Sequence, residues 1–383
     1  MATLHGEEQL ELFRDSHMVE CAGYLSKQLL TYIGSKRSLL TAIERAFLTV
    51  RKRMGKEKLS FLDAFAGSGV VSRLMKKSAC RVVVNDIESY ARVVAQCYLT
   101  NKGSVDADKL RAAVKQLNDD ANLLPVEDGF IQRLYSPRDE RNITASDRVF
   151  YTRQNASRID TYRQLIDQYD ADLRPLLLAP LLSAASIHAN TAGVFKGFYK
   201  DRVTKIGKFG GTGADALSRI TSPIRVQAPI LSNFECDYEV FQAHANDLVR
   251  DVGSFDVAYF DPPYNQHPYG SNYFMLNLIT DYREPSEISR ISGIPTDWIR
   301  SEYNVRGNSA DLMEDLVAST DARFILLSFN DEGFISPEQM RAILLGHGKL
   351  EEFTTSYNTF RGSRNLSGRS LHVTEHLYLL EKR

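Results

Sequence analysis

The sequence predicts an α/β fold built on a Rossmann-like, doubly wound and mostly parallel sheet, interrupted by an inserted and mainly helical lobe. Two buried strands indicate the sheet, because one runs into a glycine turn within 59–69 and the other into a proline turn within 255–264. The lobe is indicated by residues 101–234, which are rich in arginine, helical in pattern and without a clean buried parallel strand. The length of 383 residues is sufficient for one large core and a second lobe.

The elements of the sheet follow one another in the order that a parallel α/β fold requires. Apolar residues at helical spacing predict a helix over 36–54 that ends at Gly55. Further strands are expected at 59–63, 80–85, 236–241, 255–261 and 323–329, with a terminal strand pair near 353–357 and 371–380. Further helices are expected up to about residue 77, near 272–282 and before Gly346. We therefore expect one α/β domain over 21–100 and 235–383, preceded by an N-terminal extension over 1–20.

Composition and charge narrow the class of protein. Hydrophobic residues at 43% and charged residues at 25% are ordinary for a globular protein, and no apolar run reaches membrane-spanning length. The N-terminus is too acidic and polar for a signal peptide. The cysteines lack metal-site spacing and are expected to be reduced core thiols, at Cys21, Cys80, Cys97 and Cys236. We expect a cytoplasmic protein with no metal and no membrane partner, in which a net charge of −1 requires any nucleic-acid contact to use a local basic cluster.

The glycine turn after the first strand is the first candidate binding site. The run Asp63-Ala-Phe-Ala-Gly-Ser-Gly69 places glycines where the backbone can approach a ligand closely, and Asp86 follows the next strand, where an acid can hold ribose hydroxyls. The full dinucleotide pattern is absent, since valines follow Gly69, so a cofactor with a pyrophosphate is disfavoured. A nucleoside-like cofactor fits better, while a purely structural turn explains the same glycines.

The proline turn is the stronger signal. Asp261-Pro-Pro-Tyr264 follows a buried strand, at the edge of the sheet where open α/β proteins bind ligands. Consecutive prolines remove two amide donors, which leaves carbonyl oxygens as acceptors beside a carboxylate and an aromatic ring. That set suits the exocyclic amine of a planar base, because it offers two acceptors for two protons and a ring on which the base can stack.

These motifs together resemble those of the Dam-like (D12 class) adenine-N6-specific DNA methyltransferases. The resemblance is carried, in the family's order, by Tyr32-Ile-Gly-Ser-Lys36, Phe65-Ala-Gly-Ser-Gly69, Asn85-Asp86-Ile87, Asn246-Asp247-Leu248, Asp261-Pro-Pro-Tyr-Asn265 and the strand over 325–332. The family places target recognition between the cofactor and catalytic motifs, which here corresponds to 101–234. That lobe matches no motif, so the recognised DNA sequence is not predicted.

The resemblance implies a class I methyltransferase that uses S-adenosyl-L-methionine and acts on double-stranded DNA. The implied cofactor-binding residues are Tyr32, Lys36, Asp63, Phe65, Ala66, Gly67, Ser68, Gly69, Asp86, Ile87, Asp247 and Asp261. The implied catalytic residues are Asp261, Pro262, Pro263 and Tyr264. Asp261 and the Pro262 carbonyl would accept the two amine protons, and Tyr264 would stack on an adenine that has left the duplex. A surface lysine and a helix cap are the simpler alternatives for Lys36 and Asp247.

A basic cluster within 186–225 is the candidate DNA contact. Its acids are Asp201 and Asp215, and its glycines and aromatic residues alternate with lysines, as in a loop that follows a phosphate backbone. The expected DNA-binding residues are Asn190, Thr191, Lys196, Lys200, Arg202, Lys205 and Lys208. Asn190 and Thr191 have side chains suited to base edges. Additional positive charge is expected from Arg361, Arg364 and Arg369.

Three other functions fit parts of the same pattern. They are methylation of ribosomal RNA, methylation of the N4 amine of cytosine, and DNA binding by an inactive relative. The long lobe favours DNA over RNA, and the intact Asp261 and Tyr264 favour an active adenine enzyme. A cognate restriction endonuclease as partner, a monomer or weak dimer, and association with the nucleoid are further expectations.

Overall fold

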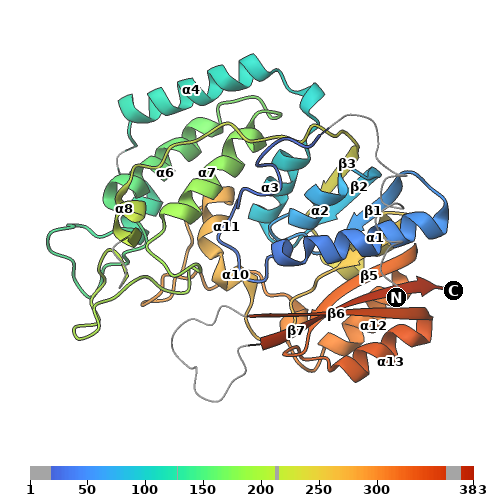
Figure 1. The fold of residues 1–383 in the computed structure, drawn as a ribbon. Coiled ribbons are helices and arrows are strands. Elements are labelled where there is room, and N and C mark those ends of the chain that lie inside the picture. The colour runs from blue at the N-terminus through green and yellow to red at the C-terminus, as the bar shows by residue number, and fades with distance from the viewer. Residues whose placement is uncertain (1–18, 127, 212–214, 359–371) are drawn as a thin grey trace, which may run out of the picture.

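The computed structural model describes residues 19–126, 128–211, 215–358 and 372–383, and its centre is a seven-stranded sheet (Figure 1). The strand order is β3-β2-β1-β4-β5-β7-β6, and all pairs are parallel except those that β7 makes with β5 and β6. The strands are β1 (Leu59–Asp63), β2 (Ala79–Asn85), β3 (Asp237–Phe241), β4 (Phe255–Phe260), β5 (Ala322–Asn330), β6 (Gly348–Asn358) and β7 (His372–Lys382). The predicted doubly wound, mostly parallel α/β fold is confirmed.

Helices cover both faces of the sheet and create a separate hydrophobic cluster on each. One cluster joins the sheet to α1 (Leu40–Met54) and α2 (Val70–Met75), and the other joins it to α9 (Ala245–Asp251), α12 (Ser309–Ser319) and α13 (Pro337–His347). Alternate residues of β4 supply the two clusters: Val257 and Tyr259 face α1, whereas Ala258 and Phe260 face α12. Burial on both faces explains why the central strands are nearly continuous apolar runs.

Short sequence signals fix the ends of the covering helices. Gly55 ends α1 in the left-handed conformation with φ of +62°, and the Ser336 hydroxyl caps α13 by accepting from the Gln339 N–H at 3.2 Å. The helix expected over 36–54 begins as a 3₁₀ turn, η2 (Lys36–Leu39). The helix expected near 272–282 is found as α11 (Phe274–Asp281), which the short helix α10 (Tyr269–Asn272) precedes. Another 3₁₀ turn, η4 (Glu302–Asn304), precedes α12.

The segment 101–234 contributes most of the remaining helices, which lie together at one side of the sheet (Figure 1). They are η3 (Lys102–Ser104), α4 (Ala107–Leu123), α5 (Phe130–Tyr135), α6 (Arg153–Ile166), α7 (Arg174–His188) and α8 (Asp215–Thr221). One hydrophobic cluster includes residues of α4 to α7 together with α3 (Ser89–Leu99) and α11. This inserted segment is therefore packed onto two helices of the α/β domain through a shared core.

The strand order also locates the edge of the sheet where a ligand can bind. It reverses between β1 and β4, since the chain winds outward from β1 through β2 to β3 and from β4 to β5. Open α/β sheets bind ligands outside the carboxyl ends of the strands at such a switch point. Both motifs singled out in the sequence, at Asp63–Gly69 and Asp261–Tyr264, directly follow these two strands.

Across the described ranges, no helix is long and apolar enough to cross a membrane. The expected buried thiols are found at Cys97 and Cys236, and Cys21 is half-buried. The expectation is wrong for Cys80, which is exposed. It lies near the start of β2, where the register with β1 shifts and the strand is irregular.

Candidate active site

A cavity of about 480 Å³ lies at the switch point, along the carboxyl ends of β1, β2 and β4. Most of the predicted cofactor residues line it: Tyr32, Lys36, Asp63, Phe65, Ala66, Gly67, Ser68, Asp86, Ile87, Asp247 and Asp261. Gly69 does not line the cavity but begins α2 in the left-handed conformation, with φ of +69°. Motifs separated by up to 229 residues, from Tyr32 to Asp261, therefore line one cavity.

The glycine turn is held in a shape that only glycine adopts easily at its centre. Gly67 has φ of +52°, and a Cβ at this position would lie 3.0 Å from the ring of Tyr32. Its backbone N–H donates to Oδ2 of Asp86 at 2.7 Å, while Oδ1 of Asp86 accepts from the Glu88 N–H at 2.9 Å. Asp86 thus braces the turn from the next strand, and it has lone pairs left for a ligand hydroxyl.

Asp63 presents an unpaired oxygen at the edge of the cavity. Its Oδ2 accepts from the Ser72 hydroxyl, but its buried Oδ1 has no hydrogen-bond partner among the described residues. Burial raises the pKa of Asp63 to about 7 and that of Asp86 to about 6, despite the hydrogen bonds that each carboxylate accepts. A cationic ligand group in the cavity would stabilise the ionised forms of both carboxylates.

Tyr32 belongs to an aromatic stack that sequence reasoning found only in part. Its ring lies 4.8 Å from that of Tyr273 and 5.2 Å from that of Tyr269, each at 17° between the planes, and its hydroxyl is 3.2 Å from that of Tyr90. The stack joins the 32–36 segment to α10 and α11 behind the proline turn. The spacing of Tyr269 and Tyr273, four residues apart in a helical stretch, was a signal for this contact.

Lys36 is buried beneath Asp261 and does not lie on the surface. Its Nζ is 2.9 Å from Oδ1 of Asp261 and 2.8 Å from Oε1 of Glu375 on β7, a residue that the sequence analysis did not single out. Burial alone would lower the pKa of Lys36, but the two carboxylates outweigh it and hold the pKa well above its ordinary value. Lys36 lines the cavity and is at the same time the ionic partner of the proposed catalytic carboxylate.

Asp261 therefore meets two opposing influences. Burial raises its pKa, the Lys36 ammonium lowers it and Glu375 raises it, and the net result is a pKa of about 6. Its side chain is 17% exposed, and the salt bridge engages Oδ1, which leaves Oδ2 as the oxygen available to an incoming amine. Above pH 6 the group is predominantly an ionised acceptor.

A second cavity of about 260 Å³ adjoins the first across the proline turn. Tyr264 lines this cavity, and Pro263 and Tyr269 line both. Its other walls come from Ile33, Val194, Lys196, Asn265, His267 and Asn272. Pro262 is buried and lines neither cavity. The site is thus two neighbouring cavities that share the Asp261–Tyr264 turn as a wall.

Tyr264 is fixed from the side of β5. Its ring meets that of Phe329 edge-on at 5.9 Å, its carbonyl accepts from the Phe334 N–H at 2.8 Å, and Lys36 Nζ is 5.9 Å from its ring centroid. The side chain is half-buried, so part of the ring is available to the second cavity.

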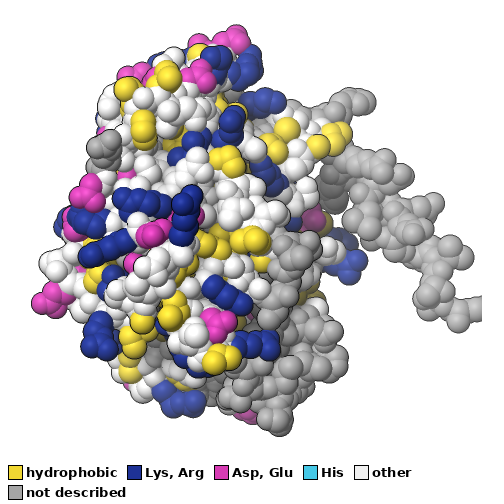
Figure 2. All heavy atoms as spheres, turned by 90° about the vertical axis from the view of Figure 1, so that its left-hand side faces the viewer, with side chains coloured by type: hydrophobic (Ala, Val, Ile, Leu, Met, Phe, Trp, Pro, Cys, Tyr) yellow, Lys and Arg dark blue, Asp and Glu magenta, His cyan; other side chains and the backbone are white. Residues whose placement is uncertain are grey.

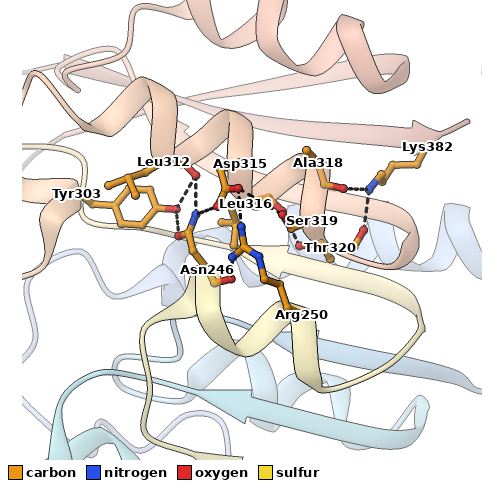
Figure 3. Close-up of polar contacts among 10 residues, drawn as sticks. All are labelled: Asn246, Arg250, Tyr303, Leu312, Asp315, Leu316, Ala318, Ser319, Thr320 and Lys382. Carbon is orange, nitrogen blue, oxygen red and sulfur yellow. Dashed lines mark hydrogen bonds and ion pairs between the residues drawn. The ribbon is translucent and has the colours of Figure 1, made fainter.

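A polar network, drawn in Figure 3, supplies another part of the wall of the first cavity. The Asn246 amide donates to the Leu312 carbonyl at 2.9 Å and to Asp315 at 2.8 Å, and its oxygen accepts from the Tyr303 hydroxyl at 2.8 Å. Arg250 donates to Asp315 at 2.6 Å. The network ties α9 to α12 and η4. The sequence analysis quoted Asn246 within a motif but did not predict its partners Tyr303, Leu312 and Asp315, which belong to none of the quoted motifs.

Asp247, the neighbour of Asn246, lines the cavity from the first turn of α9. The N-cap of α9 is His244, so Asp247 is not the capping residue. Phe65, another predicted cofactor residue, is held edge-on to the Tyr303 ring at 5.3 Å. This end of the cavity combines an aromatic face with an exposed carboxylate acceptor, as an adenine-like ring with an amine requires.

The predicted DNA residues lie on a loop that follows α7, but not all of them face outward. Asn190 is completely buried: its amide donates to the carbonyls of Val149 at 2.7 Å and Lys208 at 2.8 Å, and its oxygen accepts from the Gly210 N–H at 3.0 Å. Thr191 is also buried, and its hydroxyl accepts from the Gly193 N–H at 3.3 Å. The expectation that these two side chains read bases is therefore corrected: both hold the loop in shape.

The basic side chains of the loop are placed differently. Lys196, Lys200, Arg202 and Lys205 are exposed, and Lys208 is half-buried. The chain pairs with itself between Lys200 and Gly207 and turns through 201–206. Figure 2 shows the face of the molecule on the side of the inserted segment, where lysine and arginine side chains are widely spread with acidic ones among them. Arg219 is used internally, because its guanidinium donates to carbonyls at the end of α7.

Two further points concern residues outside the described ranges and the arrangement of possible metal ligands. Arg361, Arg364 and Arg369 lie outside the described residues, as do residues 1–18 of the expected N-terminal extension. Within the part of the chain that the structure describes, no group of three or more His, Cys, Asp or Glu side chains is arranged to hold a metal ion.

Similar proteins place the site in a known context. The Type II methyltransferase M.NlaIII of Neisseria lactamica is 30% identical over 362 residues, which are 92% of this chain and 99% of that protein. The Type II methyltransferase M.CviAII of Paramecium bursaria Chlorella virus 1 is 30% identical and covers 91% and 97%. The modification methylase StsI of Streptococcus sanguinis is 28% identical over 82% of this chain and 46% of its own length.

The match to a family extends over most of the chain, because residues 32–343 fit the family described as D12 class N6 adenine-specific DNA methyltransferase. That range includes the turns after β1 and β4, both cavities and the inserted segment. The resemblance inferred from the motifs is confirmed, and the chain belongs to the D12 class N6 adenine-specific DNA methyltransferase family.

Proposed function

We propose that this protein transfers a methyl group from S-adenosyl-L-methionine to the N6 amine of a flipped-out adenine at a specific site in duplex DNA. One observation carries the proposal: the Asp261–Tyr264 turn separates two adjoining cavities and lines both. The larger cavity suits the methyl donor and the smaller one suits the base that accepts the methyl group. In-line transfer places the donor sulfur and the acceptor nitrogen on opposite sides of the transferred methyl group, so the two ligands must meet where the two cavities adjoin.

The larger cavity has the chemistry that this donor requires. The buried carboxylate of Asp63 in the cavity wall favours a cationic group nearby, Asp86 can accept from ribose hydroxyls, and Asp247 near Phe65 suits the adenine end. Left-handed Gly67 keeps the turn free of a Cβ that would project toward Tyr32. S-adenosyl-L-methionine supplies an electrophilic methyl group on a sulfonium. The carboxylates along the cavity favour a cation of that kind.

The catalytic roles follow from the acceptors around the amine. Asp261 Oδ2 would accept one N–H of the amine, and the carbonyl of Pro262, which lines neither cavity in this structure, would accept the other once the base reaches the turn. The two acceptors would concentrate the lone pair of the amine on the side of the donor cavity. As the amine nitrogen takes the methyl group that the bound cofactor would supply, it would become positive, and Asp261 would accept the shared proton and release it to solvent. A strong base is unnecessary, because this proton becomes acidic during the transfer.

The base enters through the smaller cavity. Tyr264 offers a face on which adenine can stack, and the exposed Lys196 belongs to both the cavity wall and the basic loop. Lys200, Arg202, Lys205 and Lys208 continue that loop and would neutralise phosphates next to the flipped nucleotide. We further propose a monomer or weak dimer, cytoplasmic and associated with the nucleoid, with a cognate restriction endonuclease as its functional partner.

A methyl-transfer assay with labelled cofactor tests the proposal. The purified protein should label plasmid DNA and leave ribosomal RNA unlabelled, with saturation at a fixed number of methyl groups per plasmid. Labelling of RNA instead, or labelling that never saturates, would contradict a site-specific DNA enzyme. A calorimetric titration of the protein with the cofactor alone measures cofactor affinity, and it tests the larger cavity independently of methyl transfer.

A further inference from the structure

The ionic cluster beneath Asp261 contains two carboxylates for one ammonium. Lys36 Nζ is 2.9 Å from Asp261 and 2.8 Å from Glu375, and the side chains of Lys36 and Glu375 are 6% and 2% exposed. Burial of a second carboxylate is costly unless it has a specific partner. A simple Lys36–Asp261 pair would be complete without Glu375, so the additional acid calls for an explanation.

Glu375 occupies a position that its strand would otherwise give to an apolar side chain. On β7, Leu377 and Leu379 belong to the cluster that faces α1, and the two-residue repeat of a strand places Glu375 on that same face. The Ser328 hydroxyl on β5 donates to Oε1 of Glu375 at 2.5 Å, the oxygen that also meets Lys36. The carboxylate is therefore held from β5 and aimed at Lys36.

This geometry has a consequence for the reacting group. An ammonium that pairs with Asp261 alone would move closer to it, neutralise it and occupy acceptor capacity that the target amine needs. A second carboxylate at an almost equal distance divides the attraction and fixes Lys36 on one side of Asp261, at Oδ1. Asp261 Oδ2 then stays directed at the cavity, and the cluster keeps one net negative charge.

We infer that Glu375 is a positioning residue for methyl transfer: by sharing the charge of Lys36, it keeps Asp261 oriented and strong enough as an acceptor for the target amine. The inference rests on the proposed function of Asp261. Glu375 itself does not line either cavity, so it acts through Lys36 and not on the substrate.

The pH dependence of the methyl-transfer rate can test the positioning role of Glu375. The ionisable groups that influence Asp261 from the surrounding elements are Lys36, Asp63, Asp86, Tyr259, Tyr264, Tyr269 and Glu375. His376, next on β7, is bonded instead to Glu352 at 2.6 Å. Because Glu375 raises the pKa of Asp261, its neutralisation should lower that pKa and move the acidic limb of the rate profile to lower pH.

The test is Glu375→Gln, which keeps the shape and removes the charge. Single-turnover methyl transfer should become slower by about tenfold or more at pH 8, as expected when one electrostatic partner is lost. The affinity for S-adenosyl-L-methionine should change by less than about threefold, since Glu375 does not line the cofactor cavity. The acidic limb should shift to lower pH. The matched control is Glu381→Gln on the same strand, which loses only the surface pair with Arg323 and should keep the wild-type rate and profile.

Other outcomes separate the two claims. If Glu375→Gln keeps the parent rate and profile while Asp261→Ala is inactive, the positioning role is wrong and the proposed function stands. If Asp261→Ala is fully active, the proposed function itself fails. Should Glu375→Gln not fold, Ser328→Ala provides the test, because it removes one donor to Glu375. It should reduce the rate about threefold without changing cofactor affinity, and an unchanged rate would overturn the inference.

Discussion

Several carboxylates in the larger cavity are costly to ionise because they are buried, and a cationic ligand would lower that cost. Asp63, Asp86 and Asp261 all line it, and burial raises the pKa of each well above that of an exposed carboxylate. Perturbed groups of this kind cluster at functional sites, because the function needs a charge that the fold alone does not favour. Stability and cofactor binding should therefore respond in opposite directions to the loss of one carboxylate.

Asp63→Asn makes this opposition measurable. The folded protein holds the Asp63 pKa at about 7, above its ordinary value of 3.8, so the free energy of unfolding falls as pH rises from about 4 to about 7. Without cofactor, the variant should be more stable than the parent at pH 8, by on the order of 1 kcal/mol or more, and the difference should shrink at pH 5. Its affinity for the cofactor should fall about tenfold. Thermal unfolding of parent and variant at both pH values measures the difference in stability. A variant less stable than the parent at pH 8 would contradict the raised pKa assigned to Asp63.

Tyr264 gives a second prediction at this scale, because its proposed role is stacking and not hydrogen bonding. Replacement by Phe or Trp should keep most of the activity, while Ala should weaken capture of the base by roughly 1–3 kcal/mol. The measurement is the apparent affinity for DNA in single-turnover methyl transfer. If Phe were as damaging as Ala, the hydroxyl would be the functional group.

The sequence predicts a place in the site for residues that belong to a recognisable motif. It does not predict one for residues that reach the site only through the folding of the chain. Asp63 ends a buried strand, and Asp86 and Asp261 each directly follow one, so their common edge is implied by the sequence. Glu375 is held by Ser328, 47 residues away, and nothing local indicates it. Asn190 shows the reverse error, since a side chain suited to a base edge is equally suited to backbone groups inside a loop.

Among elements, the sheet and its covering helices were predictable because burial on both faces leaves a direct trace in the sequence. β1 and β4 are apolar runs that end in turns, and their bounds lie within a residue of those expected. The short helix α10 before α11 was not predictable, because Tyr273 serves both as the junction of the two helices and as part of the Tyr32 stack. Tertiary contacts, more than local propensity, decide such boundaries.

The loop after α7 gives a prediction at the element scale. Asn190→Ala should lower the free energy of unfolding by about 1–3 kcal/mol, because the Val149 and Lys208 carbonyls and the Gly210 N–H lose their partner. DNA affinity should fall alike on a methylated sequence and on random duplex, since the loop loses its shape and no base contact is removed. Exposed Asn142→Ala is the control and should change neither quantity. Relaxed sequence choice with unchanged stability would restore a base-reading role for Asn190.

At the scale of the whole molecule, the inserted segment is continuous with the domain that carries the site. It shares a hydrophobic core with α3 and α11, and through Val194 and Lys196 it supplies a wall of the smaller cavity. The sequence predicted where the segment lies along the chain, but its contacts with α3 and α11 depend on long-range packing that has no local signature. DNA held by the loop would therefore sit next to the base cavity.

The salt dependence of DNA binding tests that arrangement. If Lys200, Lys205 and Lys208 neutralise phosphates, replacing all three by Ala should flatten the slope of log affinity against log salt by up to about three units. The loss should be equal on specific and random DNA, because phosphate contacts carry no sequence information. The charge-matched control replaces the exposed lysines Lys52, Lys58 and Lys349, on α1 and around the sheet, and should leave the slope unchanged. An unchanged slope in the loop variant would direct the search to the Arg133–Arg163 stretch.

The most direct measurement is mass spectrometry of nucleosides from duplex DNA treated with the protein and S-adenosyl-L-methionine that carries a labelled methyl group. The parent protein should place the label in N6-methyladenine alone. Asp261→Ala should reduce that product by 10²-fold or more, on the order seen when one preorganised electrostatic partner is removed, and should still bind the cofactor. Label in N4-methylcytosine, or undiminished N6-methyladenine with Asp261→Ala, would contradict the assignment of this turn as the adenine methyl-transfer site.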